Sequence, residues 1–493
     1  MVFLDGSTYL RNPADPAYAP AQMEKLMAEG AMPLTVGLFI DPGVISKPGT
    51  DRPRRNRSYE YDRLGPDFAH FLVKELIPSL KVKISADPSL RGITGVSSGG
   101  IAAFTVAWER PDQFRRVYTS IGSFVGMRGG DRYPTWIRLT EPKPLRLFIH
   151  EGKNDLNITN GDWWIANQAL QRSLAFAGYQ HKFTWDETGH ERRGGNLVQE
   201  QALRYIWQDW KTEPVAANWT GTKHTMTKFF PSGSEWEVVS ADHNWSEGMA
   251  ITKDGTLYFT DVPDAELFRI TPEGKQSLLT NETRRANGIA LSPDESRLYT
   301  ASGGQIRAYH LPASGEDFTG EFDLVTEGTG ANDIAVSPDG KHVYYTDPGN
   351  KKVWQVDLST KKRTGYDFKD PNGISVSPDG YTLAVSHFPS HQVHTYSIDP
   401  KTGALNNRQP FYHLQLPPNA KRGANDGHAW SKNGHLLVGT ELGLQILDQE
   451  GRTQLILPRP NPTDGRVNYV ALAPPYLYIA TRHTIYRRPT LLE

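Results

Sequence analysis

The sequence predicts two domains: a mostly parallel sheet with helices on both faces, followed by an all-β six-bladed propeller. At 493 residues the chain is too long for one ordinary core. Strand-like and helix-like segments alternate over residues 1–212, as in a parallel sheet whose connections are helices. Residues 231–493 contain short strands alone, and one motif recurs there six times. Between them, residues 213–230 have little periodicity and are expected to be a linker.

The elements of the first domain follow from the period of its apolar residues. Short apolar runs predict buried strands, and an apolar face with a period of 3.6 residues predicts a helix. The expected strands are residues 36–40, 90–95, 145–150 and 180–186, and residues 1–6 are expected to be a core strand with the turn after it. The expected helices are residues 67–80, 101–108, 160–178 and 198–210.

A glycine-rich turn joins one of these strands to a helix. Its sequence, Gly95-Val96-Ser97-Ser98-Gly99-Gly100, fits the G-x-S-x-G pattern, in which a sharp turn lifts a serine hydroxyl above the sheet. Asp155 and His190 each follow a later strand, and the order Ser, Asp, His is that of hydrolases with this turn. The alternative for these positions is a glycine-rich turn, a capping aspartate and a loop histidine.

Residues 1 to about 212 resemble the enterochelin-esterase/esterase D-like family of α/β-hydrolases. The matching segments are Val2 to Gly6, Arg57 to Asp62, Gly95 to Gly100, Gly161 to Asn167, Gly189-His190, Gly194-Gly195 and Trp207 to Trp210. The resemblance implies a catalytic triad of Ser97 as nucleophile, His190 as base and Asp155 as the orienting acid. It also implies an oxyanion hole formed by the amide of Ser98 and that of Gly6 or Ser7.

Two departures from this family are visible in the sequence. Its members have two or three strands before the one that begins here at Val2, so this domain is expected to lack those strands and to leave one sheet edge unpaired. The charged run Glu191-Arg192-Arg193 follows His190, where small polar residues are expected. Glu60 has two interpretations, a structural residue or a substrate contact, of which the structural one is favoured.

The motif of the second domain is a polar residue just before a short apolar strand. The polar residues are separated by 40 to 54 residues, a spacing typical of propeller blades. The innermost strand of each blade lines a central channel, so these side chains are expected to point into it. All offer oxygen, the ligand that Ca²⁺ prefers, although Asn-Gly before a strand is also a common turn. They are Glu247, Asn287, Asn332, Asn372, Asp426 and Asn468.

Residues from about 231 to 488 resemble the SMP-30/gluconolactonase/luciferin-regenerating-enzyme-like family of six-bladed propellers. The matches are Glu247-Gly248, Asn332-Asp333, Pro371 to Ile374, Asp426-Gly427 and the Ser-Pro-Asp turns. The resemblance implies one divalent metal, most simply Ca²⁺ with Mg²⁺, Mn²⁺ or Zn²⁺ as alternatives, bound by Glu247, Asn332, Asn372 and Asp426. Asp426 is then also the expected general base, while Asn287 and Asn468 are expected to contact substrate.

The composition argues against several classes of binding partner and of chemistry. Lys+Arg 54 against Asp+Glu 55 leaves a net charge of −1, which offers no electrostatic case for nucleic acid or an anionic membrane. The absence of cysteine excludes disulfides, thiolate catalysis and cysteine-bound zinc. No apolar run has the length of a membrane span. A signal peptide is not visible before Val2, and the sequence leaves the compartment and the oligomeric state open.

Three hypotheses for function follow. In the first, a serine esterase is fused to a metal-dependent lactonase, and both act on small esters and lactones derived from sugars or plants. In the second, the propeller is a binding module that targets the esterase. In the third, the lactonase is active and the esterase-like domain serves a structural role. The intact set of channel oxygens favours the first hypothesis over the second, because a scaffold does not require them.

Overall fold

The computed structural model describes residues 1–46, 53–312, 317–418 and 420–493. It divides into two compact units, Met1–Thr227 and Lys228–Glu493. Of the segment expected to be a linker, residues 213–227 belong to the first unit, where Val215 is buried and the ring of His224 packs on Phe176. Among the described residues, no helix combines the length and apolar character needed to cross a membrane.

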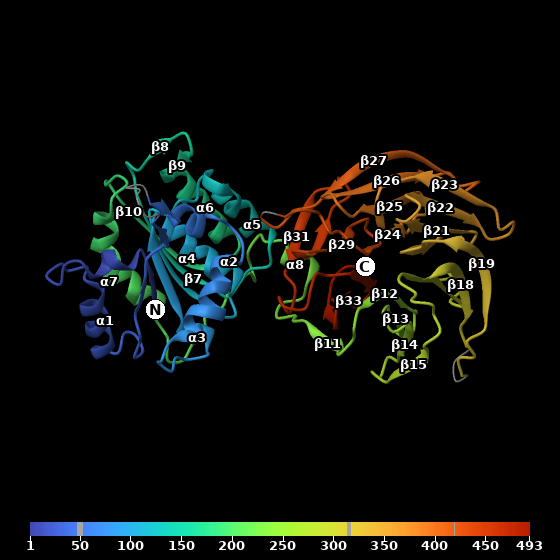
Figure 1. The fold of residues 1–493 in the computed structure, drawn as a ribbon, viewed down its shortest axis with the longest axis horizontal. Coiled ribbons are helices and arrows are strands. Elements are labelled where there is room, and N and C mark those ends of the chain that lie inside the picture. Colours follow the sequence, from blue (N-terminus) through green and yellow to red (C-terminus); the bar gives the residue numbers. More distant parts are fainter. Residues whose placement is uncertain (47–52, 313–316, 419) are drawn as a thin grey trace. The chain divides into compact units, whose positions relative to one another are not determined.

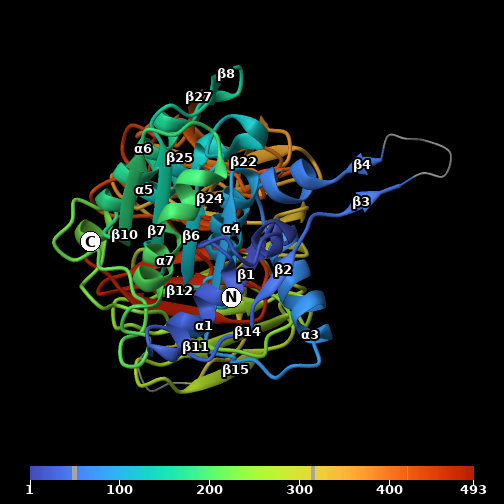
Figure 2. The same cartoon turned by 90° about the vertical axis from the view of Figure 1, so that its left-hand side faces the viewer.

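The first unit is an α/β-hydrolase-like domain built on one sheet of six parallel strands. Their order across the sheet is β10, β7, β6, β5, β1, β2, and Figure 2 shows the labelled strands side by side in that sequence. All five pairings are parallel, so the carboxyl ends of the strands meet at one edge. The strands are β1 (Val2–Leu4), β2 (Leu38–Ile40), β5 (Gly92–Val96), β6 (Arg116–Ser120), β7 (Arg146–Gly152) and β10 (Gln180–Asp186).

Helices cover both faces of this sheet because consecutive strand residues are apolar and point to opposite faces. Val2, Leu4 and Leu147 face one core together with helices α2, α4, α5 and α6, whereas Phe3 and Phe148 face a second core with α1 and α7. The long helices are α1 (Ala19–Ala28), α4 (Ser98–Glu109), α5 (Tyr133–Leu139), α6 (Trp163–Phe176) and α7 (Arg192–Trp207). The helix expected at residues 67–80 is continuous from α2 (Asp67–His70) through a π-helical stretch (Phe71–Leu76) to α3 (Ile77–Ser79).

Strand β1 is an interior strand. It pairs with β5 on one side and with β2 on the other, so the edge of the sheet is the three-residue β2. Glu60, in the π-helical turn Ser58–Asp62, accepts a hydrogen bond from the amide of Gly43 (3.0 Å), as expected of a structural residue. A pocket of about 740 Å³ runs along β2 and this turn, lined mainly by apolar side chains such as Phe39, Phe68 and Phe71.

The second unit is a propeller of six four-stranded antiparallel sheets (Figure 1). Each of the six predicted inner strands lies at one edge of its sheet and contacts the next inner strand around the ring. The ring closes by pairing β11 with β34 of the last blade. The inner strands are β12 (Ser246–Ile251), β16 (Ile289–Leu291), β20 (Ile334–Val336), β24 (Pro371–Val376), β28 (His428–Trp430) and β32 (Tyr469–Ala473), and the closing strand is β11 (Glu237–Ser240).

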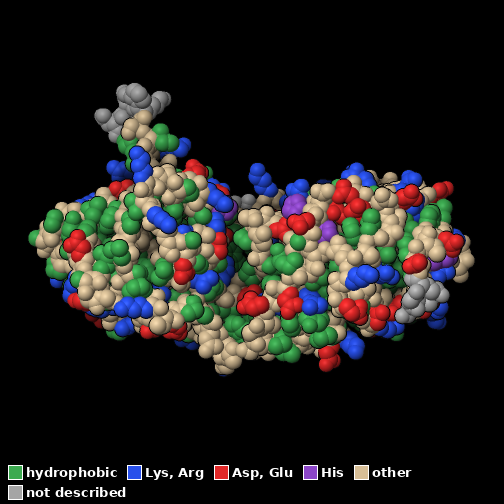
Figure 3. All heavy atoms as spheres, turned by 90° about the horizontal axis from the view of Figure 1, so that it is seen from below, with side chains coloured by type: hydrophobic (Ala, Val, Ile, Leu, Met, Phe, Trp, Pro, Cys, Tyr) green, Lys and Arg blue, Asp and Glu red, His purple; other side chains and the backbone are tan. Residues whose placement is uncertain are grey.

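The remaining strands of each blade complete the antiparallel sheets. They are β13 (Leu257–Asp261), β14 (Glu266–Ile270), β15 (Gln276–Thr280), β17 (Arg297–Ser302), β18 (Gly304–His310), β19 (Phe322–Thr329), β21 (His342–Asp347), β22 (Lys352–Asp357), β23 (Arg363–Asp367), β25 (Thr382–His387), β26 (Gln392–Ile398), β27 (Leu405–His413), β29 (Leu436–Thr440), β30 (Gly443–Leu447), β31 (Thr453–Leu457), β33 (Tyr476–Ala480) and β34 (Ile485–Pro489). The face drawn in Figure 3 carries interspersed acidic and basic side chains, as the balanced composition leads one to expect.

Candidate functional site

The sharp turn between β5 and α4 presents Ser97 at the carboxyl edge of the sheet. Ser97 has φ 59° and ψ −119°, a left-handed backbone that is strained for a residue with a side chain. The turn is tight because Gly95 has no side chain: a Cβ there would lie 2.2 Å from the carbonyl oxygen of Gly99. The strain therefore holds the Ser97 hydroxyl away from the strand, where a substrate can reach it.

The three predicted triad residues form a hydrogen-bonded chain. Ser97 Oγ lies 2.9 Å from His190 Nε2, and His190 Nδ1 lies 2.6 Å from Asp155 Oδ1. These residues follow β5, β10 and β7, whose carboxyl ends share one edge of the sheet. The Asp155 carboxyl group is fully buried, and the hydrogen bond from His190 helps to lower its pKa against the opposing effect of burial. An ionised Asp155 fixes the tautomer in which Nε2 of His190 can accept a proton.

The loop after β1 lies beside this turn and is held by Arg57. The guanidinium donates to both carboxylate oxygens of Asp5, from Nε at 2.9 Å and from its terminal nitrogen at 2.7 Å, and it also reaches the carbonyl oxygen of Val96 at 3.2 Å. It thereby ties the loop that carries Gly6 to the strand that ends at Ser97. The amide of Ser7 donates to Asp41 (3.0 Å) and is therefore already engaged within the protein.

A second acid lies behind Asp155. Glu151 is buried and accepts the amide of Gly152 (3.0 Å), while its Oε2 and Oδ2 of Asp155 are buried and accept no hydrogen bond from a described donor. Two carboxyl groups can share a hydrogen bond only if one is protonated. Burial, followed by the proximity of Asp155, raises the pKa of Glu151 to about 11, so Glu151 carries the proton and Asp155 the charge. The sequence did not indicate this role, because it depends on burial.

A buried set of similar residue types lies nearby and is structural. Ser120 Oγ is 3.0 Å from His150 Nδ1, and His150 Nε2 is 3.2 Å from Asp186 Oδ2. Ser120 is fully buried, so no substrate reaches it. Asp186 also accepts the amide of Thr188 (2.8 Å), which anchors the loop that leads to His190.

Replacing Glu151 with glutamine removes its titratable proton but keeps the shape of the side chain. Because its folded pKa lies far above its ordinary value of 4.5, the folded protein binds more protons than the unfolded chain over the pH range between those values. The free energy of unfolding therefore falls as the pH rises, by at most about 1.4 kcal/mol per pH unit. We expect Glu151→Gln, which keeps a donor for Asp155, to retain ester hydrolysis and to remove this slope in denaturant titrations between pH 6 and pH 9.

The matched control for this experiment is Glu187→Gln on the exposed turn after β10, for which we expect the wild-type slope. Glu151→Ala, which leaves Asp155 without its donor, should lower the rate of ester hydrolysis. An unchanged pH slope in Glu151→Gln would contradict a protonated Glu151.

In the propeller, the two predicted channel acids, Glu247 and Asp426, lie close together at the start of their inner strands. Glu247 and Asp426 are both buried. Burial, and then the charge of Asp426, raises the pKa of Glu247 well above its usual range. Arg466 donates to Asp426 Oδ2 from two nitrogens, at 2.7 and 3.1 Å, and the indole of Trp245 donates to Glu247 (2.6 Å).

The sequence missed Asp333 and Arg466 at this site. Asp333 directly follows Asn332 and is buried; it accepts the hydroxyl of Tyr469 (3.0 Å) and the amide of Ile374 (2.9 Å). Burial raises the pKa of Asp333 to about 7. A comparison of blades would have detected Asp333, because four of the other five blades have glycine at this position.

The four predicted asparagines lie at the same position of their blades. Asn287, Asn332 and Asn372 are half-buried at the start of β16, β20 and β24, and Asn468 is fully buried. Asn468 Nδ2 donates to the carbonyl oxygen of Ser246 (3.3 Å), while its Oδ1 is buried without a partner among the described residues. Two buried carboxylates and these amide oxygens are a donor set that suits a hard divalent cation.

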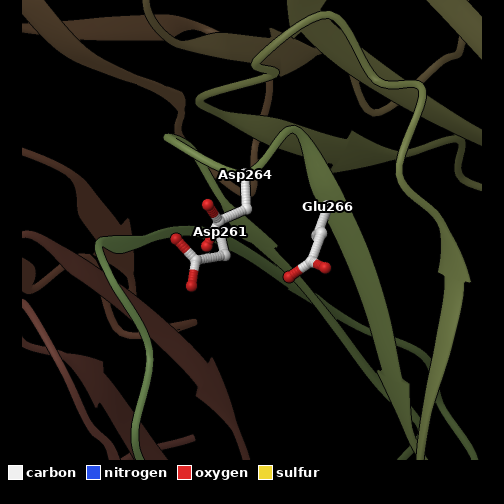
Figure 4. Close-up of side chains that lie close together, drawn as sticks. All are labelled: Asp261, Asp264 and Glu266. Atoms are coloured by element: carbon white, nitrogen blue, oxygen red, sulfur yellow. The ribbon is translucent and has the colours of Figure 1, made fainter.

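A further acidic group lies at the turn between β13 and β14 (Figure 4). Its carboxyl groups belong to Asp261, Asp264 and Glu266. Asp261 accepts the amides of Asn244 (2.8 Å) and Trp245 (2.9 Å), and Asp264 accepts the side-chain amide of Asn244 (2.6 Å). These contacts fix the loop that leads into β12, so the group has a structural explanation.

Two family models match the chain, one in each half. Residues 1–245 match the family model described as Putative esterase, and residues 245–465 match the model described as SMP-30/Gluconolactonase/LRE-like region. The first half of the chain is therefore esterase-like and the second gluconolactonase-like, and both matches are to hydrolases that act on ester or lactone bonds.

Individual relatives are similar to the second unit. A gluconolactonase of Zymomonas mobilis is 31% identical over 91 residues, which are 15% of this chain and 26% of that protein, so the match spans about a quarter of the relative's length. A gluconolactonase structure from Xanthomonas campestris is 22% identical over 52% of this chain and 90% of that one, with a TM-score of 0.46. A calcium-binding regucalcin from Agrobacterium tumefaciens is 18% identical over 53% and 94%, with a TM-score of 0.44.

Proposed function

We propose that the protein is a bifunctional hydrolase, a serine esterase fused to a divalent-metal-dependent lactonase, acting on small esters and lactones of sugar or plant origin. The observation that carries the esterase half is the chain of contacts from Ser97 through His190 to Asp155. The lactonase half rests on the buried acids and amide oxygens at the propeller channel, together with the gluconolactonase family match.

In the esterase half, Ser97 Oγ attacks the ester carbonyl carbon and passes its proton to His190 Nε2. The amides of Ser98 and Gly6 stabilise the oxyanion, and the N-terminus of α4 adds the positive end of its dipole. His190 then gives the proton to the departing alcohol, which leaves an acyl group on Ser97. Water, deprotonated by His190, releases the acid and restores the serine.

In the lactonase half, Glu247, Asn332, Asn372 and Asp426 would hold the cation. A bound divalent metal polarises the lactone carbonyl and stabilises the negative charge that develops there. Asp426 takes a proton from the attacking water and passes it to the ring oxygen as the carbon–oxygen bond of the lactone breaks. Burial raises the pKa of Asp426, and Arg466 opposes this shift and so favours the ionised form that this role requires. Asn287 and Asn468 orient the substrate through its hydroxyl groups.

The test of this proposal is the rate of hydrolysis of p-nitrophenyl acetate and of glucono-δ-lactone by the purified full chain. The proposal expects both rates to exceed the uncatalysed reactions. Ester hydrolysis alone would instead make the propeller a binding module, and lactone hydrolysis alone would leave the first unit a structural role.

A further inference from the structure

Arginines and aromatic rings gather at one end of the propeller blades. Trp245 immediately precedes β12, and Arg422 and Arg466 lie in the segments that lead to β28 and β32. Phe388 lies in the turn between β25 and β26, and Arg482 lies in the turn between β33 and β34. In a four-stranded antiparallel blade, the segment before the first strand and the turn between the second and third strands share one end. These five residues, the rim cluster, therefore lie at the end where Glu247 and Asp426 open the inner strands.

The rim cluster is a continuous row of stacked groups. Arg466 lies over both Phe388 and Trp245, with its guanidinium carbon 5.3 and 5.8 Å from the ring centroids. Arg422 lies over Phe388 at 5.0 Å, and Arg482 lies over Trp245 at 5.0 Å. A guanidinium stacked on a ring keeps its N–H groups free in its own plane, where they can meet an anion.

The inner part of this row is joined to the buried acids. The indole of Trp245 donates to Glu247, and Arg466 donates to Asp426. The negative charge of Glu441 also stabilises the charged form of Arg466, so acidic groups of the protein compensate the positive charge of Arg466. The row therefore leads from the proposed reaction site to the solvent.

The outer part of the row carries uncompensated positive charge. Arg422 and Arg482 are both exposed. Neither side chain forms an ion pair with a carboxylate of the residues that the structure describes. Two guanidinium groups thus face solvent beside the channel, each held in place by an aromatic ring instead of by an acid.

We propose that the rim cluster selects lactones that carry an anionic substituent, a carboxylate or a phosphate, with Arg422 and Arg482 as the groups that bind it. This proposal rests on the proposed lactonase function. A planar guanidinium binds either anion through paired N–H groups. Binding of the anion by the rim cluster would then orient the lactone carbonyl toward the buried acids.

The experiment compares kcat/KM for neutral glucono-δ-lactone, for glucaro-1,4-lactone with its carboxylate, and for 6-phosphoglucono-δ-lactone. We expect the wild type to prefer a charged lactone and the double variant Arg422→Gln/Arg482→Gln to lose roughly 10-fold on it, the value of a charged hydrogen bond. The neutral lactone should change by about twofold or less. Arg452→Gln, an exposed arginine in the turn between β30 and β31 at the other end of the blade, is the matched control.

The outcomes separate this proposal from the lactonase proposal. A larger loss on the carboxylate or on the phosphate substrate identifies the anion. Equal losses on charged and neutral lactones, or no loss on either, would overturn the role of the rim cluster while the lactonase function stands. If the wild type hydrolyses no lactone, calorimetric titration with D-glucarate decides: weaker binding in the double variant supports the rim cluster, and unchanged or absent binding refutes it.

Discussion

Ser97→Ala is expected to lower the rate of ester hydrolysis at least about 1,000-fold, because no other hydroxyl of this site is placed both to attack and to be deprotonated by His190. The only other hydroxyl in contact with Ser97 Oγ, among the described residues, is that of Ser123 at 3.3 Å. The measurement is the initial rate on p-nitrophenyl acetate, with lactone hydrolysis by the same sample as the check on folding.

Ser79→Ala is the control for this variant, since Ser79 lies on the exposed end of α3 and its hydroxyl donates to the carbonyl oxygen of Leu76. We expect it to retain the full rate of ester hydrolysis. If Ser97→Ala hydrolyses the ester at the wild-type rate, the triad is not the source of that activity and the esterase assignment fails.

Asp426→Asn is expected to lower the rate of lactone hydrolysis about 100- to 10,000-fold, the usual contribution of a general base. Asparagine keeps the shape of the side chain but removes the negative charge. Arg466 therefore loses its ion-pair partner, and the attacking water loses the group that deprotonates it. The variant should also be less stable, because a partly buried arginine is left unpaired. The rate on glucono-δ-lactone and the midpoint of thermal unfolding measure the two effects.

The control for Asp426→Asn is Asp379→Asn, in the turn between β24 and β25. Asp379 accepts the amide of Tyr381 (3.0 Å), and an asparagine oxygen can do the same. We expect its lactone hydrolysis to equal that of the wild type. Unchanged hydrolysis in Asp426→Asn would instead remove Asp426 from the mechanism, while ester hydrolysis in both variants should remain normal.

The features that the sequence predicts well are those carried by local chemistry or by repetition. The turn at Ser97 requires Gly95 for steric reasons, and these residues are neighbours in the chain. The inner strands recur six times, so a pattern too weak to interpret in one blade is informative in all of them.

The features that the sequence did not predict depend on groups brought together from a distance. Strand β6 begins with Arg116, an unlikely residue for a buried strand by its composition alone. It is accommodated because its guanidinium lies over the ring of Trp207, at 5.0 Å, and donates to backbone carbonyl groups of Ser89 and Ile206. The protonation of Glu151 and the pairing of Arg466 with Asp426 likewise depend on burial and on contacts that only the folded chain creates.

The central claim is that one chain holds two independent hydrolytic sites, of which only the propeller site uses a metal. The most direct test measures the hydrolysis of p-nitrophenyl acetate and of glucono-δ-lactone by the full chain, before and after a chelator and after Ca²⁺ is returned. The account predicts that the chelator abolishes lactone hydrolysis, that Ca²⁺ restores it, and that ester hydrolysis stays constant throughout. Loss of both activities together, or lactone hydrolysis that resists the chelator, would contradict it.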